Sequence, residues 1–125
     1  MKLLITGLSG TLAPKLAALA VVAGHEVIGW DHRRVRPNDA SAGAGLLREL
    51  QPQAIAHLAL GPVAWAAQLA AHAARHGLPL VFTSSAMVFH HQPDGPHHRR
   101  DPRTAEDDYG RYKIACEDAV RAACP

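Results

Sequence analysis

Apolar runs and helical patterns alternate along the whole chain. Four runs have the length and composition of strands: residues 2–6, 26–30, 54–60 and 78–89. Each is followed by a segment with apolar residues at helical spacing: residues 11–23, 42–50, 63–76 and 107–123. Strands that are separated by helices pair in parallel, so the sequence predicts an α/β fold with a parallel sheet.

This alternation predicts a Rossmann-like three-layer sandwich with strand order 3-2-1-4-5. The third strand is expected to be very short and to lie in the breaker-rich link 33–40 (RRVRPNDA). The first helix is expected to bury one face, formed by Leu12, Leu16, Leu19, Ala20 and Ala23. Residues 90–107 form a long polar loop, and loops of that length inside a compact domain are usually functional or mobile.

Length and composition restrict the class of protein. The 125 residues fit one domain over residues 1–125, and 48% hydrophobic with 19% charged residues is typical of a globular chain. No apolar run approaches the roughly 20 residues of a membrane span, and the start lacks a signal cleavage pattern. A net charge of +2 without a basic patch argues against nucleic acid. We expect a cytoplasmic protein without membrane or nucleic-acid partners.

The cysteines fit a reducing compartment. Cys116 and Cys124 fall on one predicted helix, about 12 Å apart along its axis at 1.5 Å per residue. That separation is too large for a disulfide, so both are expected to be free thiols.

The first chemical motif is a glycine turn between the first strand and the first helix. Gly7 and Gly10 are followed by Ala13, and Pro14 suits the first helical turn. Glycine lets the backbone approach a pyrophosphate, and a helix N-terminus offers free N–H groups to an anion. An ordinary strand-to-helix turn has the same pattern and is the alternative interpretation. Dinucleotide binding is favoured because Asp31 follows the second strand, where a carboxylate can bind the ribose hydroxyls.

The second motif pairs a tyrosine with a lysine on the last helix. Tyr109 and Lys113 share a helical face that continues through Cys116 and Val120, so both are expected to point toward the sheet. An ammonium beside a phenol favours the phenolate, which makes tyrosine a usable acid or base near neutral pH. A plain amphipathic helix with both side chains at its rim remains the alternative.

The third motif is the hydroxyl run Thr83 to Ser85 at the end of the fourth apolar run. In open α/β sheets ligands bind beyond the carboxyl ends of the strands, where a hydroxyl can hydrogen-bond a substrate oxygen. A simply polar strand exit is the alternative interpretation.

Together these motifs resemble those of the extended branch of the short-chain dehydrogenase/reductase superfamily. This branch includes nucleotide-sugar epimerases, dehydratases and dTDP-4-dehydrorhamnose-type reductases. The resemblance extends over nearly the whole chain and rests on LITGLSGTLA, QPQAIAHLAL, PLVFTSSAMVF, Asp101-Pro102 and YGRYKIACEDAV. It implies a catalytic set of Ser85, Tyr109 and Lys113, with Ser84 as the second choice for the hydroxyl. It also implies NAD or NADP contacts at Gly7, Ser9, Gly10, Thr11, Leu12, Ala13, Asp31, His32, Arg33, Leu58, Ala59, Tyr109 and Lys113.

The resemblance implies a function and a cofactor preference. The expected function is NAD(P)-dependent oxidoreduction or epimerisation at a carbonyl or hydroxyl of a nucleotide-sugar-like substrate. NAD is favoured because Asp31 would repel a 2′-phosphate and lies nearer than Arg33 and Arg34. The alternative is a catalytically silent dinucleotide-binding module, or a half-enzyme that needs a partner chain.

Several positions depart from the family pattern. Arg99 stands where relatives carry glutamate, Ala105 where they carry proline, and the asparagine expected after HLA is missing. Relatives continue beyond the AACP ending into a substrate domain. We therefore expect this chain alone to bind a dinucleotide weakly, to turn over nothing, and to self-associate or pair with a partner chain.

The histidines are expected to contribute no native metal site. His57 lies in an apolar run and is expected to be a packed, hydrogen-bonded core residue. A second group clusters in the polar loop, without a nearby cysteine or a zinc-like spacing, so adventitious metal binding is favoured over a native site: His90, His91, His97 and His98.

Overall fold

A parallel sheet forms the centre of the chain. The computed structural model describes residues 1–90 and 95–124. Its strands are β1 (Lys2–Thr6), β2 (Glu26–Gly29), β3 (Ala54–His57) and β4 (Leu80–Phe82), in the order β2-β1-β3-β4. Every pairing is parallel, with Leu4 opposite both Ile28 and Ile55. The predicted α/β fold is confirmed.

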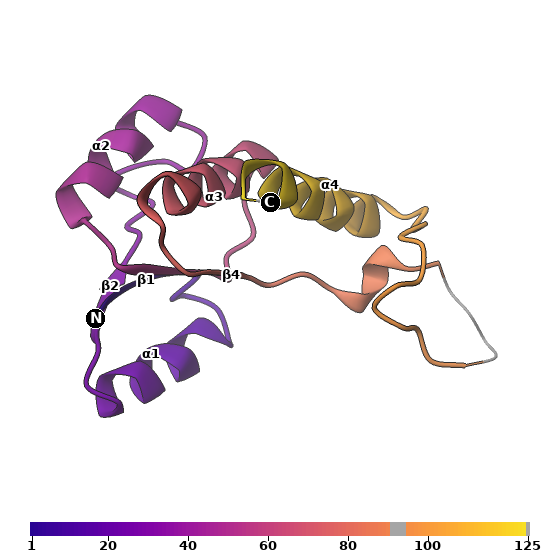
Figure 1. Cartoon of the computed structure of the whole chain (residues 1–125), viewed down its shortest axis with the longest axis horizontal. Coiled ribbons are helices and arrows are strands. Elements are labelled where there is room, and N and C mark those ends of the chain that lie inside the picture. The colour runs from indigo at the N-terminus through magenta and orange to yellow at the C-terminus, as the bar shows by residue number, and fades with distance from the viewer. Residues whose placement is uncertain (91–94, 125) are drawn as a thin grey trace.

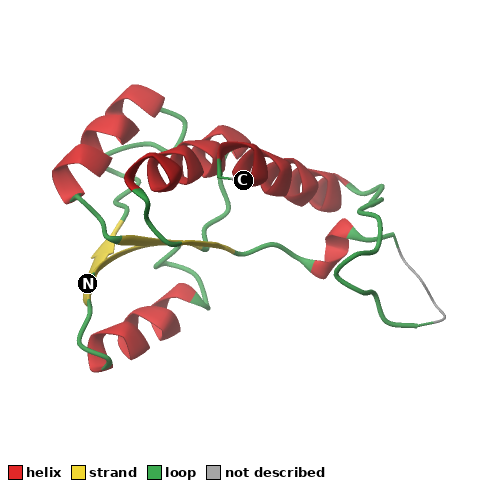
Figure 2. Cartoon of the chain, viewed as in Figure 1, coloured by secondary structure: helices red, strands yellow, loops and turns green. Residues whose placement is uncertain are grey.

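Helices cover both faces of this sheet. Helix α1 (Ala13–Val22) lies on one face, and α2 (Ala40–Leu50), α3 (Val63–His76) and α4 (Asp108–Ala123) lie on the other (Figures 1 and 2). A 3₁₀ helix, Ala86–Val88, follows β4. This is the three-layer sandwich that the sequence predicts.

Local signals set the ends of the helices. Asp39 begins α2 by accepting a hydrogen bond from the Ala42 amide, and Asp107 begins α4 by accepting one from Gly110. Gly77 ends α3 in a left-handed conformation with φ of +64°, which glycine adopts without strain.

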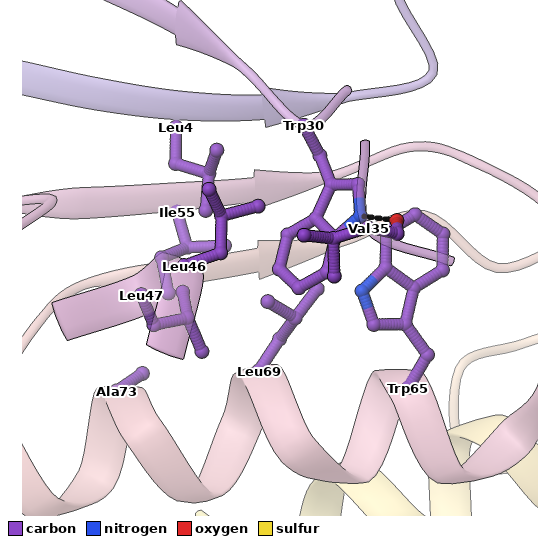
Figure 3. Close-up of a cluster of buried hydrophobic side chains, with 9 residues drawn as sticks. All are labelled: Leu4, Trp30, Val35, Leu46, Leu47, Ile55, Trp65, Leu69 and Ala73. Carbon is purple, nitrogen blue, oxygen red and sulfur yellow. Dashed lines mark hydrogen bonds between the residues drawn. The ribbon is translucent and has the colours of Figure 1, made fainter. Parts of the chain in front are cut away.

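The main core lies between the sheet and the helices α2 and α3. Leu4 and Ile55 from the sheet pack with Leu47 and Leu69 from the helices (Figure 3). The indole N–H of Trp30 donates to the Val35 carbonyl oxygen at 2.9 Å, which satisfies a buried donor. A smaller cluster of Ile5, Ala13 and Ala56 joins α1 to the other face.

Three details of the prediction are wrong. The very short strand in 33–40 is absent, because the amides of Arg34 and Val35 both donate to the Asp31 carbonyl in a helical turn. Of the five residues predicted to form the buried face of the first helix, Leu12, Leu19 and Ala23 are exposed. Helix α1 contacts the sheet instead through Ala13, Leu16, Ala17 and Ala20. The run 78–89 contains only three strand residues.

Within the described residues, we find no helix with the length and apolar character that a membrane crossing requires.

Candidate functional site

A cavity of about 930 Å³ opens where the chain leaves the carboxyl ends of β1, β2 and β3. Seven of the predicted cofactor residues line it: Gly7, Ser9, Gly10, Asp31, His32, Leu58 and Ala59. The other six predicted contacts are not among the described lining residues: Thr11, Leu12, Ala13, Arg33, Tyr109 and Lys113. The sheet therefore gathers most of the predicted dinucleotide contacts at one edge.

The glycine turn has a backbone that other residues would strain. Gly7 has a φ of +86°, and a Cβ there would lie 3.0 Å from the backbone nitrogen of Ala59. The Gly10 amide donates to the Gly7 carbonyl at 2.9 Å, which closes the turn. The turn thus requires glycine at position 7 for both its conformation and its close approach to the segment after β3.

Helix α1 begins directly after this turn and has no side-chain cap. Leu12 at its N-cap makes no side-chain capping hydrogen bond, and Pro14 occupies the first turn. An uncapped helix N-terminus carries about half a positive charge and unpaired N–H groups. Together with the glycine turn, this end of α1 fits a diphosphate.

A buried hydrogen-bond network holds the part of the cavity wall that follows β3. Thr6 Oγ1 accepts from the amides of Leu58 and Ala59, each at 3.1 Å. The Thr6 hydroxyl lies 2.7 Å from His57 Nδ1. Because its oxygen already accepts from two amides, its proton is donated to His57 Nδ1, which leaves the imidazole proton on Nε2.

The imidazole of His57 is a neutral core group, as predicted. It is 3% exposed and packs edge-on against the Trp65 ring, with the ring centroids 4.7 Å apart. Burial, and to a smaller degree the charge of Lys113, lowers the pKa of His57 from 6.5 to about 4. No sequence pattern identified Thr6 as its partner, since the two residues lie on different strands.

Charged residues surround the end of β2 in an arrangement that differs from expectation. Asp31 lines the cavity and accepts a hydrogen bond from the Arg33 amide at 2.9 Å. Arg34 does not line the cavity and forms a bidentate ion pair with Glu49, with Nη1–Oε1 and Nη2–Oε2 distances of 2.9 and 2.6 Å. Arg36, which the sequence analysis missed, is the arginine that lines the cavity.

A second region joins the start of α4 to the 3₁₀ helix after β4. The Ala105 amide donates to the Val88 carbonyl at 3.0 Å, a bond that a proline at position 105 could not make. A Cβ on Gly110 would lie 2.4 Å from the Met87 carbonyl oxygen. Glycine at position 110 therefore lets the turn that carries Tyr109 pack against the segment that follows Ser85.

The predicted tyrosine and lysine differ in their surroundings. Lys113 is 3% exposed, donates to the Thr83 carbonyl at 3.1 Å and lies 5.1 Å from the centre of the Phe82 ring. Tyr109 is 39% exposed, so the expectation that both point toward the sheet is wrong for Tyr109. Tyr109 lies in the first turn of α4, and the buried Lys113 lies one turn further along the helix.

The two candidate serines make different hydrogen bonds. The Ser84 hydroxyl donates to the Glu117 carboxylate, which Arg103 also contacts at 2.9 Å. Ser85 Oγ accepts from the Met87 amide at 3.1 Å, a bond that leaves its proton available to another acceptor. This difference favours Ser85 over Ser84 as a donor to a substrate oxygen.

A separate depression beside the serines is rich in arginine. Its walls include both serines, Phe89 and Glu117, together with the cationic residues Arg99, Arg100, Arg103 and Arg121. Arg103 is bound by Glu117 and Asp118, and Arg121 lies 3.9 Å from Glu117. Arg99 thus lines the same depression as Ser85, at a position where the family pattern predicts a glutamate.

The remaining histidines and cysteines give no metal site among the described residues. His91 lies outside the described residues, and no group of three metal-ligating side chains occurs within the described ones. His97 stacks on Phe89 with the ring centroids 4.8 Å apart. Cys116 is buried and Cys124 partly buried, and both are free thiols as predicted.

Comparison with known families places this site in context. A family model described as the RmlD substrate binding domain matches residues 62–125. No curated protein matches the sequence.

Solved structures match the whole chain. dTDP-4-dehydrorhamnose reductase from Clostridium acetobutylicum has a TM-score of 0.90 at 24% identity, over 100% of this chain and 50% of that one. The Bacillus anthracis enzyme of the same name, in complex with NADP, has a TM-score of 0.84 at 22% identity, over 99% and 50%. WbmH from Bordetella bronchiseptica, in complex with NAD+, has a TM-score of 0.83 at 21% identity, over 98% and 52%. This chain spans about half the length of these structures, and the similarity shows a shared fold.

Proposed function

Since this chain belongs to the RmlD substrate binding domain family, we propose that it binds a nicotinamide dinucleotide and acts on a carbonyl or hydroxyl of a nucleotide-sugar-like substrate. The observation that carries the proposal is the cavity at the carboxyl ends of β1 to β3, which has a glycine turn at positive φ and an uncapped helix N-terminus beside it. Similar folds include structures in complex with NADP and with NAD+.

The residues of the cavity fit the parts of such a cofactor. Gly7 and Gly10 would let the diphosphate approach the backbone closely, and the N-terminus of α1 would face it with the positive end of the helix dipole. Asp31 would accept hydrogen bonds from the adenosine ribose hydroxyls. Leu58 and Ala59, fixed by the Thr6 hydroxyl, would form the wall on the β3 side. When bound, the nicotinamide supplies or accepts a hydride.

The residues around the start of α4 would transfer a proton to and from the substrate oxygen. Tyr109 would donate a proton to the carbonyl oxygen of the substrate as the carbonyl carbon receives the hydride, and would take it back in the reverse direction. The Ser85 hydroxyl would hydrogen-bond the same oxygen. The buried ammonium of Lys113, on the same helix as Tyr109, would favour the phenolate left after proton transfer.

Calorimetric titration with NADH and NADPH tests the binding half of the proposal. We expect Gly10→Val to weaken binding at least tenfold, because its side chain would enter the space over the turn, where even a Cβ lies 3.2 Å from the Gly7 oxygen. Gly45→Ala is the matched control, since position 45 lies in α2 with only the end of Arg48 within 4 Å. Wild-type protein that binds neither dinucleotide would refute the proposal.

The same titration measures cofactor preference. We propose that NADH binds more tightly than NADPH, because the Asp31 carboxylate lines the cavity and would repel a 2′-phosphate. Arg34 is held by Glu49 and is not available to offset this repulsion. Tighter binding of NADPH would reverse the preference and point to Arg36, the arginine in the cavity wall.

A dinucleotide-binding module without turnover is the second candidate. It is favoured by one observation: among the described residues, the cavity is lined by neither Tyr109 nor Lys113. Oxidation of the reduced cofactor, assayed with dTDP- and UDP-linked keto sugars, separates the two candidates. Turnover by the wild-type chain supports the enzyme, whereas dinucleotide binding without turnover supports the silent module.

A further inference from the structure

Tyr112 makes an unusual pair of hydrogen bonds across the fold. Its hydroxyl donates to the Gly61 carbonyl oxygen at 2.6 Å and accepts from the Gly61 amide at 3.0 Å. The two residues are 51 positions apart, so this contact depends on the packing of α4 against the segment between β3 and α3. One side chain thereby satisfies both backbone groups of a loop residue.

The bound loop is part of the cavity wall. Leu58, Ala59, Leu60 and Pro62 line the cavity on either side of Gly61. The Trp65 ring also lies close to Gly61, because a Cβ there would lie 2.6 Å from Cε3 of Trp65. Gly61 is thus contacted by both the Tyr112 hydroxyl and the Trp65 ring, and Trp65 itself lines the cavity.

The Thr6 hydroxyl already fixes the first part of this segment through the amides of Leu58 and Ala59. Residues 60–62 lie beyond its reach, and Tyr112 provides the next side-chain anchor along the chain. This is the loop from which the asparagine expected by resemblance is missing.

Tyr112 also connects the loop to the candidate proton-transfer residues. It lies between Tyr109 and Lys113 on α4, and the Lys113 ammonium is 5.7 Å from the centre of the Tyr112 ring. Burial is the largest cause that raises the pKa of Tyr112 above its ordinary value, so its hydroxyl keeps its proton at neutral pH and remains a donor.

We propose that Tyr112 is a positioning residue whose hydroxyl holds the 58–62 segment as the wall of the dinucleotide cavity. It thereby couples this wall to the helix that carries Tyr109 and Lys113. The identity of the ligand rests on the proposed function, whereas the anchoring of the loop does not.

The test removes only the hydroxyl, with Tyr112→Phe, in the full chain without ligand. Hydrogen exchange followed by NMR should show protection of the Gly61 amide reduced about tenfold or more, because its acceptor is gone. Protection in the middle of α4 should stay unchanged. Arg111→Ala, at the adjacent exposed position of the same helix, is the control and should leave Gly61 protected.

A titration with NADH and NADPH then connects the loop to binding. For Tyr112→Phe we expect the Kd to rise about fivefold to twentyfold, as for the loss of a hydrogen-bonded anchor of about 1 to 2 kcal/mol. The Arg111→Ala variant should bind as wild type does.

Each result decides the proposal. Unchanged Gly61 protection in Tyr112→Phe would overturn the anchoring, and lost protection with an unchanged Kd would overturn the positioning role. A variant that unfolds globally would also overturn it, because the hydroxyl would then support the whole fold rather than the wall. If the wild type bound no dinucleotide, the proposed function would fail, while Gly61 protection would still decide the anchoring.

Discussion

Replacing Thr6 by valine tests whether the buried hydroxyl network supports the cavity wall. Thr6 is fully buried, and its hydroxyl contacts His57 Nδ1 and the amides of Leu58 and Ala59. Valine has nearly the same shape but cannot hydrogen-bond, so Thr6→Val removes these contacts without opening a cavity.

The expected loss of stability follows from the groups left without a partner. A buried polar group that loses its partner costs about 1 to 3 kcal/mol. The Leu58 and Ala59 amides are only partly buried and belong at the low end of that range, whereas His57 is 3% exposed and belongs higher. We therefore expect Thr6→Val to lower the free energy of unfolding by about 3 to 4 kcal/mol.

Urea unfolding monitored by tryptophan fluorescence measures this loss, because Trp30 and Trp65 are both buried. Thr6→Ser is the matched control: it keeps the hydroxyl and loses one methyl group, which costs about 1 kcal/mol. If Thr6→Val proved as stable as Thr6→Ser, the network would add nothing to the fold and the reasoning would be refuted.

Two further predictions concern the histidine and the tyrosine. Because burial lowers the pKa of His57 from 6.5 to about 4, the unfolded chain takes up a proton more readily than the folded one between these values. Neutral His57 therefore makes its full contribution to the free energy of unfolding above pH 6.5. As the pH drops to 4, this free energy falls by about 3 kcal/mol, because each pKa unit corresponds to 1.36 kcal/mol. Urea unfolding across this range should show the fall in the wild type and a flatter profile in His57→Gln; equal profiles would contradict it. Any reductase activity should drop about a hundredfold or more in Tyr109→Phe while dinucleotide binding survives, as measured by cofactor oxidation and calorimetry. Equal activity in this variant would remove Tyr109 from the mechanism.

Much of the architecture could be predicted from the sequence because its signals are local. The apolar periods distinguish strands from helices, and parallel pairing follows from their alternation. The glycine turn at Gly7 could also be predicted, because only a few neighbouring residues decide its backbone conformation. The burial of Lys113 was likewise predicted from its helical face.

Other features depended on contacts between distant parts of the chain. Thr6 with His57, and Gly61 with Tyr112, are both separated by 51 residues, so no local pattern pairs them. The ion pair of Arg34 with Glu49 left Arg36 as the arginine of the cavity wall, although the sequence pointed to Arg33 and Arg34. The helical period put Tyr109 on the same face as Lys113, but in the fold Lys113 is buried and Tyr109 is exposed. Periodicity indicates which residues share one face of a helix or strand. Which other element covers that face depends on tertiary packing, because residues from distant parts of the chain must be buried and hydrogen-bonded together.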